Sequence, residues 1–110
     1  MNKHVTSLEL SKKLKELGVK QESEFYHAGD KRIIANEVKK LFPVLFSAFL
    51  SSEIGEMLPE YQTTWKSSEK FGLGWHCNDD NQEEEYHQTA NTEANARALM
   101  LIYLIENNLI

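Results

Sequence analysis

The sequence predicts an α+β domain in which helices pack on an antiparallel sheet of three to five strands. Apolar residues recur at helical spacing near both ends of the chain, over residues 7–17 and 93–107. Between them, residues 71–77 alternate with a period of two, and polar, glycine or proline clusters separate the other β-branched or aromatic segments. We therefore expect an N-terminal helix, a short central helix, and a C-terminal β-meander followed by a last helix.

Composition narrows the class of protein. The 110 residues suit a single domain covering residues 1–110. A net charge of -5 and an isoelectric point near 5.3 disfavour a protein that neutralises nucleic-acid phosphates. The single cysteine cannot form an internal disulfide, and the first ten residues lack the apolar core of a signal peptide, which favours a reducing cytoplasm. The longest apolar run, residues 98–105, is far below the roughly 18 residues of a membrane span, so we expect no membrane segment.

The first helix has start and stop patterns of its own. Thr6 is placed to cap it, with Glu9 completing a capping box, so that the helix begins near Ser7. Gly18 stands where a left-handed residue ends a helix, and Val19 follows as its apolar contact. A narrow buried stripe is formed by leucines at helical spacing: Leu10, Leu14 and Leu17.

Residues 25–35 predict two short strands around a turn at Gly29 and Asp30. Aromatic and β-branched side chains suit a sheet with one face covered. The candidates for the inward face are Tyr26 with either Ile33 or Ile34.

The segment 36–50 is ambiguous. Its first part fits a helical turn that Pro43 breaks, and the apolar residues that follow fit either a strand or the lead-in to a helix. Ser51 or Ser52 is then expected to cap a short helix, which must stop before Pro59 because proline disfavours a helical residue before it.

The predicted meander is centred on residues 71–77. Their alternation places one set on a buried face, namely Phe71, Leu73, Trp75 and Cys77, and the other set outside, namely Gly72, Gly74 and His76. Residues 61–67 and 83–90 have the composition of neighbouring strands, and residues 78–82 suit a connecting loop. Glycines in a strand mark a bulge, a crossing loop or a partner chain that approaches the backbone closely.

Thr92 is expected to cap the last helix, with Glu93 favourably placed in the helix dipole. Its core stripe should face the meander and comprises Ala94, Ala98, Leu101, Ile102, Ile105 and Leu109. Four further apolar side chains lie on the flanks: Leu99, Met100, Tyr103 and Leu104. The first helix accounts for part of their cover, and a second copy of the protein is a candidate for the rest. With Gly72 and Gly74, these four residues are the candidate partner interface.

The most reactive group in the sequence is formed by His76, Cys77 and His87. A register that places His76 opposite His87 leaves both imidazoles on one face, where Asp79 or Glu85 could complete a zinc site. Parity argues against Cys77 as a ligand, because adjacent strand residues point to opposite faces. The alternative interpretation is a buried Cys77 and two surface histidines.

Two segments together resemble a known type of protein. "SSEIGEMLP" at residues 51–59 and "TEANARALMLIYLIEN" at residues 92–107 are similar to segments of a family of small uncharacterised proteins from prophages and other mobile elements of gut bacteria. The likeness extends to the N-terminal helix but not to residues 25–49. Leu99 stands where the family pattern has lysine or another polar residue. The resemblance implies a cytoplasmic accessory protein and supplies no catalytic residue.

The sequence thus favours a non-enzymatic protein-interaction or regulatory module that acts on a host or phage protein, with a homodimer as one arrangement. We expect no catalytic residue and no cofactor, since Cys77 has acidic surroundings and no orienting group in the sequence. The first alternative is a small metal-binding domain or enzyme that uses His76 and His87. The second is a weak nucleic-acid binder that uses the lysines of the first helix.

Overall fold

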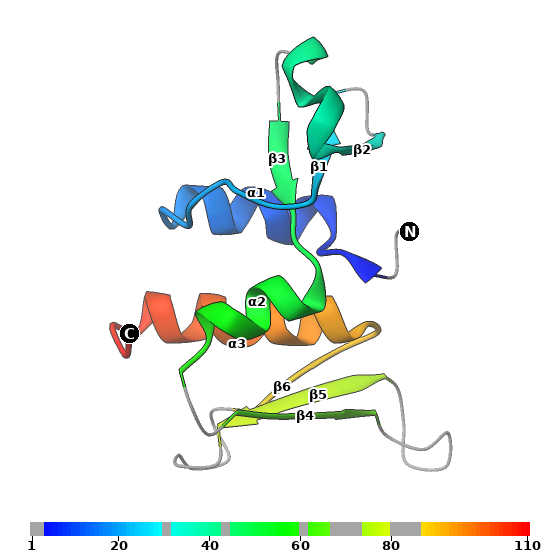
Figure 1. The fold of residues 1–110 in the computed structure, drawn as a ribbon. Helices are drawn as coiled ribbons and strands as arrows, with labels where there is room; N and C mark the ends of the chain where they lie inside the picture. Colours follow the sequence, from blue (N-terminus) through cyan, green and yellow to red (C-terminus); the bar gives the residue numbers. More distant parts are fainter. Residues whose placement is uncertain (1–3, 30–31, 43–44, 60–61, 67–73, 80–86) are drawn as a thin grey trace.

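Three α-helices and two separate antiparallel sheets make up the described part of the chain (Figure 1). The structure is a computed structural model that describes residues 4–29, 32–42, 45–59, 62–66, 74–79 and 87–110. The helices are α1 (Leu8–Glu16), α2 (Ser51–Met57) and α3 (Glu93–Glu106). The predicted α+β class is confirmed, but the strands form two sheets of three instead of one sheet.

The first sheet has the order β2-β1-β3 and contains the predicted hairpin. Its strands are β1 (Phe25–Ala28), β2 (Ile33–Ala35) and β3 (Leu45–Ala48), and a 3-10 helix, η2 (Asn36–Leu41), leads from β2 towards β3. The ambiguous apolar segment is therefore a strand, paired with β1 from Phe25↔Ala48 to Ala28↔Leu45. Tyr26, Ala28 and Ile34 are buried together, and Phe42 and Leu45 pack against them. Asp30 and Pro43 lie outside the described residues.

The second sheet has the order β4-β5-β6, which confirms the predicted meander. Its strands are β4 (Gln62–Lys66), β5 (Trp75–Asp79) and β6 (His87–Ala90). Phe71, Gly72 and Leu73 of the predicted central strand, and the connection over residues 80–86, fall outside the described residues. The short helix α2 and the segment after it carry the chain from β3 past α3 to β4, so the two sheets lie on opposite sides of α3 (Figure 1).

Helix α1 ends as predicted, and both its cap and its first residue lie one position later than predicted. Gly18 has a φ of +88°, and the amides of Gly18 and Val19 donate to the carbonyls of Lys15 and Leu14. The cap is Ser7, whose Oγ accepts from the amide of Leu10. The predicted cap at Thr6 is wrong, because the buried hydroxyl of Thr6 has partners elsewhere: the amide of Phe49 and the hydroxyl of Ser11.

Helix α2 is present, but neither Ser51 nor Ser52 caps it. The cap is Leu50, whose amide donates to Oε1 of Glu53 at 2.8 Å, so the acidic half of a capping box acts alone. Ser51 is already helical, and its hydroxyl donates to Glu93 of α3 instead. The hydrogen bond to Glu93 therefore engages the Ser51 hydroxyl, which local rules assign to the cap.

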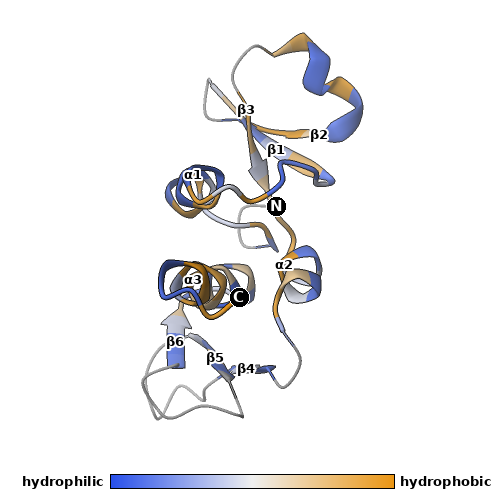
Figure 2. Cartoon of the chain, turned by 90° about the vertical axis from the view of Figure 1, so that its left-hand side faces the viewer, coloured by the Kyte–Doolittle hydropathy of each residue, from blue (hydrophilic) through white to orange (hydrophobic). Residues whose placement is uncertain are grey.

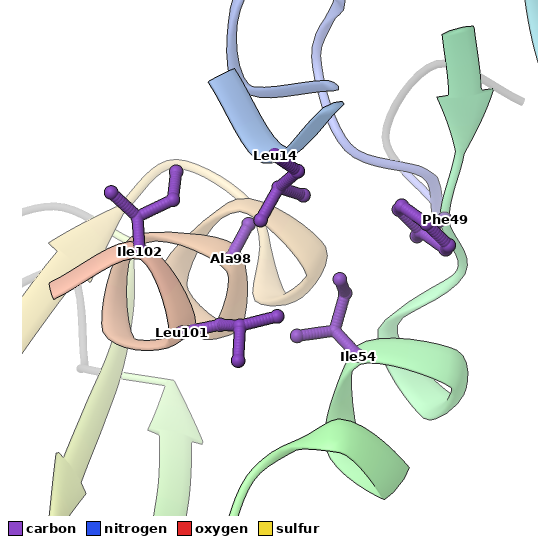
Figure 3. Close-up of a cluster of buried hydrophobic side chains, with 6 residues drawn as sticks. All are labelled: Leu14, Phe49, Ile54, Ala98, Leu101 and Ile102. Carbon is purple, nitrogen blue, oxygen red and sulfur yellow. The ribbon is translucent and has the colours of Figure 1, made fainter. Parts of the chain in front are cut away.

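Helix α3 lies at the centre of the molecule and packs on both sides. It is capped as predicted by Thr92, whose Oγ1 accepts from the amide of Asn95. One side faces α1 and α2 across a core of Leu14, Phe49, Ile54, Ala98, Leu101 and Ile102, whose side chains converge in Figure 3. The other side of α3 carries Ala96, Met100 and Leu104, which pack with Cys77 of the second sheet. Apolar residues accordingly cover much of the circumference of α3 in Figure 2.

This packing corrects the predicted orientation of α3. The stripe containing Ala98, Leu101 and Ile102 was expected to face the meander, yet it faces the other helices. The side chains that face the meander are instead Met100 and Leu104, which the sequence places on the flanks of the helix. They are 0% and 2% exposed, respectively. Two buried stripes, each with its own cover, explain the apolar character of the helix. No helix in the described ranges is long and apolar enough to cross a membrane.

Candidate functional site

The outer face of the second sheet carries a cluster of three rings from three strands: Trp65 of β4, His76 of β5 and His87 of β6. Trp65 is the direct cross-strand partner of His76. His76 pairs with Thr89, and His87 pairs with Asn78, so the two histidines are diagonal neighbours instead of the predicted opposite pair. A shift of two residues preserves the face, and both side chains still lie together.

The rings of this cluster contact one another closely. Nδ1 of His76 and Nε2 of His87 are 2.8 Å apart, within hydrogen-bond distance. The indole of Trp65 stacks on His76 with a centroid distance of 4.9 Å and an interplanar angle of 9°. It meets the ring of His87 edge to face at 5.3 Å. Both histidines are half-buried and Trp65 is 39% exposed, so solvent reaches the cluster.

Cys77 does not join the two histidines. It points to the opposite face, where it is 0% exposed and packs against Met100 and Leu104 of α3. Its sulfur lies 3.8 Å from the side-chain oxygens of Gln62 and Thr64. Within the ranges that the structure describes, no three His, Cys, Asp or Glu residues gather around a point that could hold a metal ion.

The other predicted metal ligands remain untested. Asp79 ends β5, but its side chain is not among the described ones, and Glu85 lies outside the described residues.

Most of the α3 residues of the candidate partner interface are packed inside the chain. Met100 and Leu104 are buried within the chain, and Tyr103 packs half-buried beside them. Leu99 alone of the four flanking residues lies outside that cluster, at intermediate exposure. The surface expected from the flanks of α3 is therefore mostly internal.

A contact within the chain explains why residue 74 is glycine. Its φ is +86°, and a Cβ atom at this position would overlap the carbonyl oxygen of Ala90. A close approach of β6 thus requires glycine here, which corresponds to the intramolecular alternative. Gly72, its predicted companion, is outside the described residues.

An apolar groove that is open to solvent runs between the C-terminal ends of α1, α2 and α3 and has a volume of about 570 Å³. Its apolar lining comprises Leu17, Val19, Met57, Leu101, Ile105 and Ile110. Lys20 and Glu22 also line it and form an exposed ion pair with each other. The sequence pattern marked these side chains only as helix stripe or helix end, because the three segments are far apart in the chain.

Arg97 is a second feature that the sequence pattern did not single out. Its Nε donates to Oγ1 of Thr64 at 3.1 Å, and its Nη1 donates to the carbonyl oxygen of Ser51 at 3.0 Å. The same Nη1 lies 3.6 Å from Oε1 of Glu93. Gly55 leaves room for this guanidinium, because a Cβ atom there would lie 2.8 Å from Nη1. Arg97 therefore ties α3 to both α2 and β4.

Replacing Arg97 with methionine should lower the free energy of unfolding by about 1–3 kcal/mol, because three polar partners lose a charged donor in a half-buried setting. Lys13→Met is the matched control. Its ion pair with Glu106 has both side chains more than 40% exposed, so the expected loss is within about 0.5 kcal/mol. Urea unfolding of both variants measures the difference. Equal losses would mean that Arg97 has no structural role beyond that of a surface charge.

No family model, no curated protein and no solved structure matches this chain.

Proposed function

We propose that the protein is a non-enzymatic protein-interaction module and that the apolar groove between α1, α2 and α3 is its binding surface. The observation that carries the proposal is the lining of the groove by six apolar side chains, one of which, Ile110, forms an exposed apolar segment with Leu109. These two side chains are 43% and 55% exposed. Apolar surface of this kind, concentrated in one place, is typical of protein-binding sites.

The occupant that fits the groove is the same segment of a second copy. In a twofold contact the same surface of each copy packs against that of the other. This surface must therefore contain both a projecting apolar group and a recess that accepts it. Ile110 lines the groove and is also the most exposed of its apolar residues, and Leu109 projects beside it. Lys20 and Glu22 supply one charge of each sign on the same surface, so a twofold-related copy can pair each with its opposite.

The biological setting of the proposal rests on the resemblance stated above. Proteins of prophages and mobile elements work inside the host, which is consistent with a cytoplasmic accessory protein whose dimer acts on a host or phage protein. The segments that carry the resemblance, residues 51–59 and 92–107, supply Met57, Leu101 and Ile105 of the groove. The proposal needs no catalytic group.

The test is the mass of the untagged protein over a concentration series, measured by native mass spectrometry and by light scattering after size exclusion. We expect a monomer–dimer equilibrium, and the double variant Leu109→Ser/Ile110→Ser should raise the dimer dissociation constant at least about tenfold. Leu41→Ser is the matched control, because Leu41 is 71% exposed on η2, remote from the groove.

Three results would overturn the dimer at this groove: a monomer at every concentration, a dimer that the double variant leaves intact, or a dimer that Leu41→Ser weakens equally. If a monomeric protein instead binds a defined host or phage protein with an affinity that the double variant lowers, the groove has a different occupant. In that case the self-association proposal is wrong and the interaction module stands.

A further inference from the structure

The two histidines of the ring cluster present nitrogen atoms to one another in a way that also suits a shared metal ion. We infer that His76 and His87 chelate a divalent ion of the late first transition row, with Cu²⁺ or Ni²⁺ as the best fit. The site is independent of the apolar groove, because it lies on the outer face of the second sheet, whereas the groove lies between the helices on the far side of α3 (Figure 1).

The distance between the two nitrogens selects the geometry. Imidazole nitrogens lie about 2.0–2.1 Å from such an ion, so two of them at a right angle are about 2.9 Å apart, whereas tetrahedral ligands are about 3.3 Å apart. Nδ1 of His76 and Nε2 of His87 are 2.8 Å apart. Neighbouring positions of a square-planar or octahedral ion therefore match this separation better than tetrahedral positions do. Because the two nitrogens share a hydrogen bond in the metal-free pair, binding also requires that proton to move to the other nitrogen of its ring or to solvent, and both rings to turn toward the ion.

The rings are held in place before any ion binds. Adjacent strands β5 and β6 fix the two backbones, with Asn78↔His87 and His76↔Thr89 as neighbouring pairs. Trp65 stacks on one ring and meets the edge of the other, which restricts the rotation of both imidazoles. A preorganised pair loses less conformational entropy on binding than two mobile side chains would.

The donor set defines the chemical class of the ion. Two imidazoles favour copper, nickel or zinc over magnesium and calcium, which prefer oxygen ligands. Among the described residues no third His, Cys, Asp or Glu joins them, so the described part of the site supplies two ligands. The charge of the chain also favours cations here, since residues 51–110 contain eleven Asp or Glu and three Lys or Arg.

The experiment titrates untagged protein with CuCl₂ or NiCl₂ and measures binding by calorimetry and by tryptophan fluorescence. All variants carry His4→Gln, because a histidine close to the N-terminal amine could bind copper by itself. The reference His4→Gln protein should bind one equivalent of ion, and His76→Gln or His87→Gln should each weaken binding at least about tenfold. Both are half-buried surface positions, and far-UV circular dichroism checks that the variants are folded.

Quenching of tryptophan fluorescence tests where on the protein the ion binds. Trp65 touches both imidazoles, whereas Trp75 packs towards α3 on the opposite face, so bound Cu²⁺ should quench mainly Trp65. Trp65→Phe should therefore remove most of the quenching while the ion still binds. The inference is overturned if the His4→Gln protein binds no stoichiometric ion, or if folded His76→Gln and His87→Gln proteins bind it as tightly as the reference. Neither result bears on the dimer at the groove.

Discussion

Met100→Ala should lower the free energy of unfolding by about 2–5 kcal/mol, the usual range for a fully buried methionine. Leu99→Ala, one residue earlier on the same helix, should cost roughly 1 kcal/mol or less, because that side chain is partly exposed. Met100 is 0% exposed and packs in the cluster that joins α3 to Cys77 of β5. A net stability of about 5–15 kcal/mol is usual for a domain, so the first variant would be close to unfolding.

The measurement is urea unfolding followed by circular dichroism, with both variants compared at equal protein concentration. The pair is matched in helix position and in the size of the deletion, so helix propensity largely cancels. Equal and small losses would show that α3 is not covered by the second sheet. A large loss at Leu99 alone would indicate that this residue, and not Met100, faces a core.

The pattern of the last helix illustrates what a sequence can and cannot specify. Its cap at Thr92 and its apolar character follow from local rules, and both are confirmed. Spacing alone cannot say which apolar stripe meets which partner, since Leu101 and Met100 belong to different stripes that are both apolar. The partners come from segments up to 90 residues away, such as Leu14 and Cys77.

Local end-of-helix patterns were reliable where no distant group competed for the same atoms. The turn at Gly18 depends only on backbone conformation and was predicted in detail. The caps at Thr6 and Ser51 were wrong because each hydroxyl bonds to a group remote in sequence, Phe49 and Glu93 respectively. Short polar side chains have many alternative partners in a folded chain, which limits prediction from spacing.

For the histidine pair, the sequence likewise predicts the local feature, the face of the strand, and misses the long-range feature, the register. Alternation along a strand placed His76 on the outer face and Cys77 inside, and the structure agrees. The register was missed by two residues, because loop length fixes it and the pattern cannot. The stacking of Trp65 on His76 depends on how β4 aligns with β5, so it was equally beyond reach from the sequence. The apolar groove combines three helices and could be found only in three dimensions.

Gly74→Ala should be among the most destabilising substitutions available in this chain, and Gly18→Ala is its matched control. Both glycines have nearly the same positive φ, +86° and +88°. An alanine there costs about 1–2 kcal/mol from conformation alone. At Gly18 nothing lies within 4 Å of the added Cβ, so this conformational cost should be the whole effect.

At Gly74 the added Cβ would also overlap the carbonyl oxygen of Ala90 and lie 3.0 Å from its carbonyl carbon. Both are backbone atoms of Ala90, the last residue of β6, so they cannot move aside as a flexible side chain would. Relief requires separating β5 from β6 near the Trp75↔Ala90 pair, which disturbs the strands that position His76 and His87. We expect Gly74→Ala to exceed Gly18→Ala by at least about 2 kcal/mol in urea unfolding.

The same substitution should weaken the binding of Cu²⁺ in protein that remains folded, because the spacing of the two imidazoles depends on the register of β5 and β6. Gly18→Ala, on the other side of the molecule, should leave that affinity unchanged. Equal stability losses at the two glycines would mean that β6 does not approach Gly74 as closely as described. A large difference in stability with unchanged copper affinity would mean that the imidazole pair tolerates movement at its strand ends.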